Sequence, residues 1–322
     1  MTGCARPGRS RALRYGAGTS LLVLLICTVI AGLSARTLDT VGARVGAATA
    51  RGHGAVIRSG DQTAEIRWSA AGVGSAAGIS RTDTVTLATR SPPVGTRTEV
   101  AYDPRRPGGV FIPGSAELAA VDRAASGVAF SALVAAVVLS TLGWQLITRR
   151  RLVRRAGQVT MARLTVARRV RMQSGLLTRS WFELEATTPG TQARRWIPVH
   201  FDPVLMTLPA PAPVRLHGDP RRNRLLTVEA DGVWLHPAGP ARAGEPPGRR
   251  IDSPTLPDTD GLPATGWRRQ LRADAALVTP APVVGLLWAF LDGGGVLTWA
   301  CATALTAALA LCWAALRGSD PS

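Results

Sequence analysis

The most constraining feature of this sequence is an unbroken apolar run over residues 127–147 that ends at a cluster of arginines. As an α-helix, about 21 residues extend roughly 31 Å, which is close to the hydrocarbon thickness of a bilayer. Gln145 is the one strongly polar side chain of the run, and Trp144 lies where an indole ring prefers the membrane interface. Because a buried core helix seldom runs this long without a polar face, the run predicts a membrane span.

Charge is distributed along the chain as it is in membrane proteins. The net charge is +17, and the 38 basic residues are all arginine, which is typical of a GC-rich bacterium. Nine arginines and no acid lie between positions 149 and 171, whereas acids offset the arginines between the first two apolar runs. This is the positive-inside pattern. We therefore expect a cytoplasmic N-terminus and no nucleic-acid partner, because a membrane explains most of the charge.

Five arginines follow the 127–147 run, and two interpretations of them stay open. They can anchor the span and attract anionic lipid, at about 1 kcal/mol per arginine near the membrane surface. They can also form a docking patch for an acidic partner or a specific lipid headgroup. The candidate lipid or partner contacts are Arg149, Arg150, Arg151, Arg154 and Arg155.

Changes of composition divide the rest of the chain into segments. The first apolar run is either an uncleaved anchor or a signal peptide cleaved after Ala35, although Leu33 is a poor residue near such a cut. We expect a basic cytoplasmic tail at 1–18, a transmembrane helix at 19–35, an extracytoplasmic β-module at 36–125, a transmembrane helix at 127–147, a cytoplasmic β-module at 149–238, a Pro/Gly-rich linker at 239–266, and transmembrane helices at 276–291 and 296–316.

The last two apolar runs predict a helical hairpin. Asp292 and the glycines that follow it divide a stretch that is too long for one span, and water reaches Asp292 in such a turn. Pro280 lies near the start of the first arm, so Thr279 is expected to cap that helix. The arm is then short for a bilayer. Two topologies stay open: four spans with both termini inside, or three spans with the C-terminus outside.

Both β-modules contain short runs in which apolar and polar residues alternate, a pattern typical of half-buried strands. We expect Trp68 and Tyr102 in the core of the first module, and Trp181, Trp196 and Phe201 in the core of the second. Strands are expected at 55–58, 63–68, 84–88, 98–102 and 110–112, with a loop at 70–78, and then at 159–166, 181–186, 196–201, from 214 onward, at 225–228 and at 233–236.

The sequence Asp-Pro-Arg-Arg occurs at 103–106 and again at 219–222, each time after an alternating strand and before an apolar one. Proline suits the second position of a turn in which Asp103 accepts a backbone hydrogen bond. The recurrence indicates either two related modules or a coincidence favoured by the arginine-rich composition, and both alternatives stay open.

The chain offers few candidates for catalysis or metal binding. None of the four histidines has the spacing of a metal-binding pair, and no G-x-S-x-G, P-loop or G-x-G-x-x-G sequence occurs. We therefore expect surface or strand-end histidines, no catalytic residues, no cofactor and no metal. An enzyme would instead bring four side chains into one cleft: His200, Asp202, His217 and Asp219.

The segment 98–107, TEVAYDPRRP, resembles a motif of uncharacterised bacterial membrane proteins that are grouped as a domain of unknown function. In that family a small β-module lies between two spans and ends in V-x-Y-D-P-x-x-P. The resemblance covers roughly 19–147 and implies this layout, but no activity. The second half departs from it, because the counterpart at 219–222 lacks the tyrosine and the final proline. The matching residues are Val100, Tyr102, Asp103, Pro104 and Pro107.

The sequence therefore predicts an α+β membrane protein with four transmembrane helices, or three, and two small β-rich modules on opposite sides of the bilayer. We expect a non-enzymatic protein of the bacterial plasma membrane whose modules contact other membrane or envelope proteins. The alternative is an enzyme or a transporter accessory that acts through the cytoplasmic module. An enzyme needs converging polar side chains in a pocket, whereas a contact module needs an exposed sheet edge or apolar patch.

Overall fold

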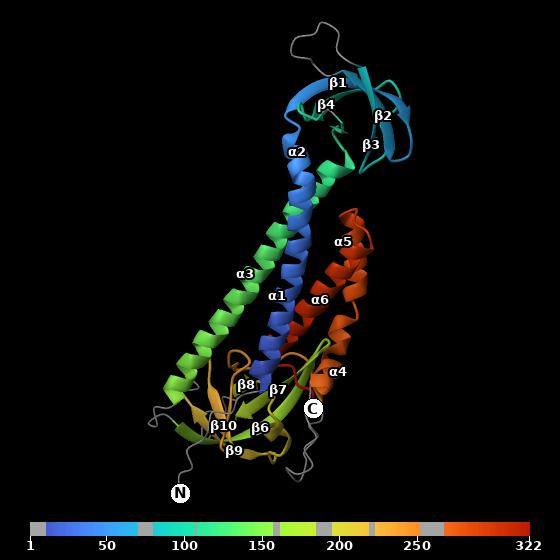
Figure 1. Cartoon of the computed structure of the whole chain (residues 1–322). Helices are drawn as coiled ribbons and strands as arrows, with labels where there is room; N and C mark the ends of the chain where they lie inside the picture. The colour runs from blue at the N-terminus through green and yellow to red at the C-terminus, as the bar shows by residue number, and fades with distance from the viewer. Residues whose placement is uncertain are drawn as a thin grey trace. The chain divides into compact units, whose positions relative to one another are not determined.

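The computed structural model describes residues 11–69, 80–106, 108–156, 162–184, 195–218, 223–251 and 267–322. Within these residues the protein is α+β, with long apolar helices and two curled sheets (Figure 1). The fold class expected from the sequence is confirmed to this extent. The loop expected at 70–78 lies outside the described residues.

Three helical stretches of the described chain are long and apolar enough to cross a membrane: Arg14–Ala47, Ala116–Arg154 and Val296–Arg317. A fourth span is present if α4 and α5, which meet at a 46° bend, form one broken span. The helices are α1 (Arg11–Thr37), a π-helical turn (Leu38–Gly42), α2 (Ala43–Ala47), α3 (Ala116–Ala156), α4 (Trp267–Val278), α5 (Ala281–Leu291) and α6 (Val296–Arg317).

The helix α3 continues well beyond the apolar run at 127–147. It has 41 residues and includes the arginines that follow the run. Alanine and arginine are strong helix formers, so nothing in the local sequence ends the helix where the apolar residues stop. Residues 149–156, the basic start of the expected 149–238 module, are therefore helical, and the first strand of the second sheet begins at Ala162.

The junction between α4 and α5 also differs from expectation. The Thr279 hydroxyl donates a hydrogen bond to the Ala276 carbonyl, 2.8 Å away in the last turn of α4, and accepts none from the α5 amides that the structure describes, so it does not cap α5. Pro280 has no N–H and cannot continue α4, which accounts for the bend. Beyond it, α5 approaches α6 closely at Gly285, where an added Cβ would lie 2.2 Å from the Thr303 hydroxyl.

The first sheet has five strands in the order β3-β2-β1-β4-β5, with every neighbouring pair antiparallel. All five strands expected from the sequence are present. The rings of Trp68 and Tyr102 lie 4.8 Å apart in a buried cluster, which confirms both as core residues. The strands are β1 (Ala50–Ser59), β2 (Thr63–Ser69), β3 (Ser80–Thr86), β4 (Arg97–Tyr102) and β5 (Val110–Phe111).

The turn between β4 and β5 has the predicted geometry. The Asp103 carboxylate accepts a hydrogen bond from the Arg105 amide at 2.8 Å, and its carbonyl accepts one from the Arg106 amide at 3.2 Å. Pro104 therefore occupies the second position of the turn, where its fixed φ is favourable. Pro107 lies outside the described residues.

The second sheet has seven strands. Six follow the order β11-β10-β9-β6-β7-β8, and β12 pairs with β6. Trp181, Trp196 and Phe201 are buried, as predicted. The strands are β6 (Ala162–Ser174), β7 (Leu177–Leu184), β8 (Arg195–Val199), β9 (Ala212–His217), β10 (Thr227–Ala230), β11 (Val233–Leu235) and β12 (Arg249–Ile251).

The linker prediction was wrong for residues 239–251. Arg242 exchanges two backbone hydrogen bonds with Trp196, and β12 pairs with β6 around Met172. Backbone pairing needs no apolar side chains, so a Pro- and Gly-rich composition did not reveal it. Residues 252–266 lie outside the described chain.

The two sheets share one strand order. In each, the first strand lies between the second and the fourth, the third pairs with the second, and the fifth pairs with the fourth. In both sheets Asp-Pro-Arg-Arg lies between the fourth and fifth strands, although 219–222 is outside the described residues. This shared order favours two related modules over coincidence.

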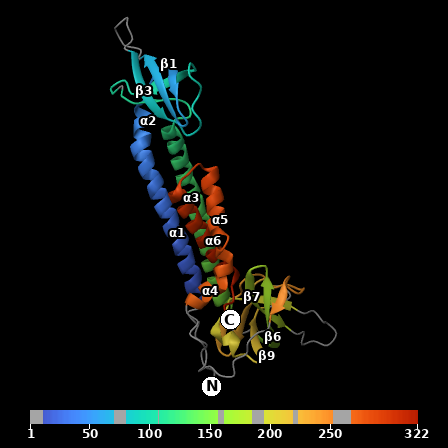
Figure 2. The same cartoon turned by 90° about the vertical axis from the view of Figure 1, so that its right-hand side faces the viewer.

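The chain divides into two compact units. Unit 1 comprises Met1–Leu25, Ala136–Ala289 and Val296–Ser322, and holds the second sheet. Unit 2 comprises Ile26–Ala135 and Phe290–Gly295, and holds the first sheet. Within unit 1, α4 lies beside the start of α1 and beside α6 in both views (Figures 1 and 2).

Candidate functional site

The most distinctive feature of unit 1 is a set of buried polar side chains where the helices adjoin the second sheet. It begins with the segment after α6, which turns at Gly318, whose φ is +75°. Ser319 then forms an antiparallel bridge with Arg179 of β7, and the Asp320 amide donates a hydrogen bond to the Thr178 carbonyl at 2.9 Å. Backbone pairing therefore places the Asp320 side chain against β6 and β7.

The Asp320 side chain is fully buried and is surrounded by donors from the second sheet. Its Oδ2 lies 3.0 Å from Arg169 Nη2, and Ser180 Oγ donates to the same oxygen at 2.5 Å. Arg171 Nε lies 3.5 Å away, and Ser322 Oγ donates to Oδ1 at 2.6 Å. We call these five residues the Asp320 cluster.

The charge of Asp320 is stabilised by its surroundings. Burial raises the pKa of Asp320, but the Arg169 guanidinium and the hydrogen bonds from Ser180 and Ser322 lower it by more. The net effect is a lowered pKa. Arg169 also donates to the Leu205 carbonyl at 2.7 Å, which uses another of its N–H groups. The pair is ionised and well bonded, the condition under which removing one partner of a buried ion pair costs about 3–5 kcal/mol.

A second buried carboxylate, Asp274, lies on α4. Tyr15 Oη from α1 donates to its Oδ2 at 2.8 Å, and Gln270 Nε2 donates to the same oxygen at 3.2 Å. The Ser319 hydroxyl donates to the other carboxylate oxygen. We call these four residues the Asp274 cluster. Since Ser319 directly precedes Asp320, two adjacent residues join α1 and α4 to the second sheet.

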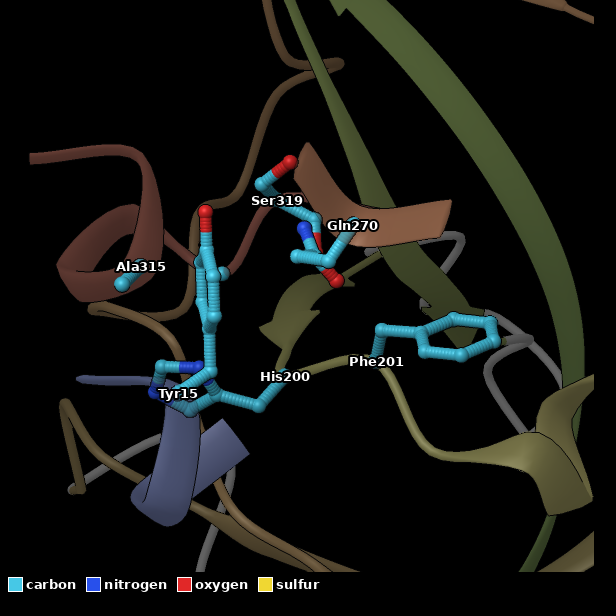
Figure 3. A pocket seen from close by; sticks show the side chains of 7 residues that line it. Tyr15, His200, Phe201, Gln270, Ala315 and Ser319 are labelled. Carbon is cyan, nitrogen blue, oxygen red and sulfur yellow. The ribbon is translucent and has the colours of Figure 1, made fainter. Parts of the chain in front are cut away.

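A small cavity lies beside the Asp274 cluster. Its volume is about 20 Å³, enough for about one water molecule and far below the size of a substrate pocket. Figure 3 shows the side chains of Tyr15, Gln270 and Ser319 gathered on it, while Phe201 points away from them. The remaining lining residues are His200, Ala315 and Gly318.

His200 also belongs to a third group of buried polar side chains. Its Nε2 lies 3.4 Å from Arg149 Nη2 on α3. Because a guanidinium only donates hydrogen bonds, Nε2 is the acceptor, and the proton of the neutral ring is on Nδ1. Burial lowers the pKa of His200 to about 3, with further lowering by Arg149, His236 and Arg179. Burial and Arg149 lower the pKa of His236 to about 4.

We call Arg149, Arg179, His200 and His236 the Arg149 cluster. Burial, then Arg317 and Arg242, lower the pKa of Arg179 to about 10. Three buried nitrogens of this cluster have no hydrogen-bond partner among the described residues: Arg149 Nη1, His200 Nδ1 and His236 Nδ1.

The candidate contact arginines of the sequence are thus divided by the structure. Arg149 is half-buried and faces the two histidines, whereas Arg150, Arg151 and Arg154 are exposed. Arg155 lies in α3, and its side-chain surroundings are outside the described part of the protein. The five residues therefore do not form one uniform patch.

His200 and His236 directly follow β8 and β11, so they are strand-end histidines as expected, but they are buried, at 6% and 7% exposed. His53 is exposed, as expected. His217 Nε2 lies 2.9 Å from a Glu229 carboxylate oxygen across β9 and β10, so its partner differs from that of His200.

The aspartates named with these histidines do not complete a cleft. Asp202 accepts a hydrogen bond from the Val204 amide at 3.1 Å and so caps the short helix Pro203–Met206. Asp219 lies outside the described residues. The convergence of four side chains that the enzyme alternative requires is therefore not seen among those that the structure describes.

Sequence reasoning missed Asp274 and Asp320. Near the last two apolar runs it considered only Asp292, which is exposed in the turn of the hairpin, as expected. Gln270 and Asp274 lie four residues apart on α4, and that spacing is a usable signal for a shared polar face. Asp320 had no such signal, because its partner Arg169 lies 151 residues away.

No group of three or more His, Cys, Asp or Glu side chains in the described ranges could hold a metal ion. The chain matches no protein-family model, no curated protein and no solved structure. The resemblance of the 98–107 segment therefore stays a prediction based on its motif.

Proposed function

We propose that this protein is a four-span protein of the bacterial plasma membrane, with both termini and the second sheet in the cytoplasm and the first sheet outside. Large apolar side chains that remain exposed along the helices support lipid as their surroundings. The distribution of arginine supports the orientation. Examples of these exposed side chains are Leu21, Leu25, Leu133, Val137, Leu286 and Leu297.

We further propose that it is a non-enzymatic contact protein that holds partner proteins at the two membrane surfaces. The observation that carries this proposal is that the buried polar side chains of unit 1 bond one another across α1, α4, the 319–322 segment and the second sheet. These bonds fix the sheet to the helices. A protein bound to the second sheet would then be held rigidly at the membrane.

A transporter accessory is the second candidate. Asp274 is a buried carboxylate on a helix that forms part of the bent candidate span, and such groups often carry protons or ions. The water-sized cavity lies between its partners and His200. If the protein has this role, the Asp274→Asn variant should still fold but should change the flux through a co-purifying transporter. The contact role would leave that flux unchanged.

Orientation can be tested with a matched pair of cysteines. Ser69→Cys and Ser174→Cys each replace an exposed serine at the end of a strand, one in each sheet. In a background with the four natural cysteines changed to alanine, a membrane-impermeant maleimide should label position 69 in intact spheroplasts. Position 174 should be labelled only after permeabilisation. The reverse pattern would overturn the proposed orientation.

The contact role can be tested by purification from native membranes after mild cross-linking. We expect defined partners with the wild-type chain and with Glu245→Gln, which removes only an exposed ion pair to Arg250. Asp320→Asn should lose the cytoplasmic partners, because the second sheet is no longer fixed. Recovery of the same background proteins from all three variants would contradict the proposal.

A further inference from the structure

Among the described residues of unit 1, buried Arg169 has an internal carboxylate and half-buried Arg149 has none. Arg169 pairs with Asp320 at 3.0 Å. No carboxylate of the described residues pairs with Arg149, whose Nη2 contacts His200 and whose buried Nη1 has no partner. Withdrawing part of a guanidinium from water without a counter-charge is unfavourable. The Arg149 cluster therefore has the form of a site that is completed by an anion.

The neighbours of Arg149 add donors and positive charge. His200 and His236 are each more than nine-tenths buried, and each has an Nδ1 with no partner among the described residues. Arg179 donates to the carbonyls of Ala238 and Arg317 and lies close enough to His200 to affect its pKa. An oxyanion can accept hydrogen bonds from guanidinium and imidazole N–H groups together.

The position of the cluster on the helices identifies the kind of anion. Arg149 follows the apolar run of α3 by two residues, and Arg317 ends α6. Trp144 and Trp313 stay 70% and 45% exposed near these ends, and the Arg317 guanidinium lies 5.7 Å from the Trp313 ring. Tryptophan and arginine together mark the level of lipid headgroups. A phosphate at this level belongs to a phospholipid whose acyl chains lie along the helices.

We propose that the Arg149 cluster binds the phosphate group of an anionic phospholipid on the cytoplasmic side of the membrane. Arg149 supplies its unpartnered Nη1, a guanidinium donor that suits a phosphate, and the unpartnered ring nitrogen of His236 supplies a second polar group. His200 holds Arg149 in place by accepting from its Nη2. The proposal rests on the membrane location and orientation proposed above. It separates Arg149, which binds one headgroup, from the exposed Arg150, Arg151 and Arg154, which attract anionic lipid without a defined site.

The experiment uses the full-length chain in nanodiscs of phosphatidylcholine alone or with phosphatidylglycerol, and native mass spectrometry counts retained lipid. The wild-type chain should retain phosphatidylglycerol and show a higher unfolding temperature with it. Arg149→Gln should lower the apparent affinity about tenfold, because a charge-assisted hydrogen bond is lost. Arg150→Gln, the matched control on the next residue of the same helix, should retain lipid as the wild-type chain does.

A third arm adds inorganic phosphate to nanodiscs of phosphatidylcholine alone. An equal rise in unfolding temperature with phosphate would show a free-anion site and would overturn the lipid assignment. Equal loss of lipid from Arg149→Gln and Arg150→Gln would overturn the site itself.

His236→Asn is a second variant that keeps Arg149, and it should also weaken lipid retention if the cluster is the site. Unchanged retention in both His236→Asn and Arg149→Gln would contradict the proposal. The cysteine-labelling pattern at positions 69 and 174 is recorded on the same variants. A reversed pattern would refute the orientation, whereas normal labelling without lipid retention would refute only the lipid site.

Discussion

The two sheets of this protein share a strand order but differ in what stabilises them. The first sheet is built around an apolar cluster that includes Trp68 and Tyr102, and its unit has an exposed ion pair between Arg44 and Glu117. The second sheet has an apolar core as well, but it adds the buried Asp320 cluster and is joined through Ser319 to α1 and α4.

This difference concerns how each sheet is stabilised. A sheet joined to helices by buried charges cannot move without breaking costly bonds. We therefore expect variants in the two sheets to behave differently, and the predictions below test that contrast from the largest effect to the smallest.

The largest effect is expected for Asp320→Asn. It removes the counter-charge that Arg169 pairs with, so we expect the free energy of unfolding of unit 1 to fall by about 3–5 kcal/mol. Tryptophan fluorescence during denaturation reports this through Trp181 and Trp196 of the second sheet. Glu245→Gln is the control, and its effect should stay below about 1 kcal/mol because the ion pair is exposed.

Acidification should destabilise the second sheet more than the first. The pKa values of His200 and His236 are about 3 and about 4 in the folded state, below the ordinary value of 6.5. The unfolded chain therefore binds more protons, and stability is complete above pH 6.5 and is lost as pH falls toward 4. Arg149 and Arg179 stay charged throughout. Each histidine contributes at most about 1.4 kcal/mol per pH unit.

The pH effect is measured by denaturation at several values between pH 7 and 4.5. His236→Asn should flatten the dependence, and His53→Asn, a change at an exposed position, should not. If the free energy of unfolding falls with pH at the same slope in the wild type and in both variants, groups other than His236 control the pH dependence.

Trp68→Phe tests the first sheet in isolation. It removes the hydrogen bond from Trp68 Nε1 to Asp83, 2.7 Å in length, and leaves a small cavity in the core. We expect the free energy of unfolding of the first sheet to fall by about 2 kcal/mol. Limited proteolysis should then cut within β1–β4 sooner while leaving β6–β9 protected. Faster cleavage in both sheets would show that they unfold together.

Tyr15→Phe is expected to have the smallest effect. It deletes one donor to Asp274 while Gln270 and Ser319 keep theirs, so we expect a loss of about 1 kcal/mol in unit 1. Thermal unfolding in nanodiscs measures it, with Tyr15→Ala as a comparison that also removes the ring packed on Trp267. No change in either variant would mean that α1 is not fixed through Asp274.

Much of the architecture could be predicted because its signals are local. Apolar runs predicted the helices α1, α3, α5 and α6, and alternation predicted all five strands of the first sheet, since each depends on neighbours in the sequence. The helix α4 precedes its apolar run and was not predicted. Element ends were less accurate. The apolar run at 127–147 does not indicate that alanines and arginines extend α3 on both sides. The strand β12 lies in a segment without periodicity.

The candidate site could not be predicted, because its partners are distant in the sequence. Asp320 looks like a solvated acid near the end of the chain until Arg169 is placed beside it, and His200 looks like a strand-end histidine until Arg149 covers it. Only the i,i+4 spacing of Gln270 and Asp274 was visible in the sequence.

The central claim is that the second sheet and the helices of unit 1 form one cooperative body through Asp274, Ser319 and Asp320. Native-state hydrogen exchange of the full-length protein in nanodiscs tests it most directly. The account predicts that amides of β7, α4 and the 319–322 segment open with the same free energy, and that Asp320→Asn lowers all three together while β1–β4 are unchanged. Exchange of the 319–322 segment at the rate of an exposed loop, with β7 still protected, would contradict it.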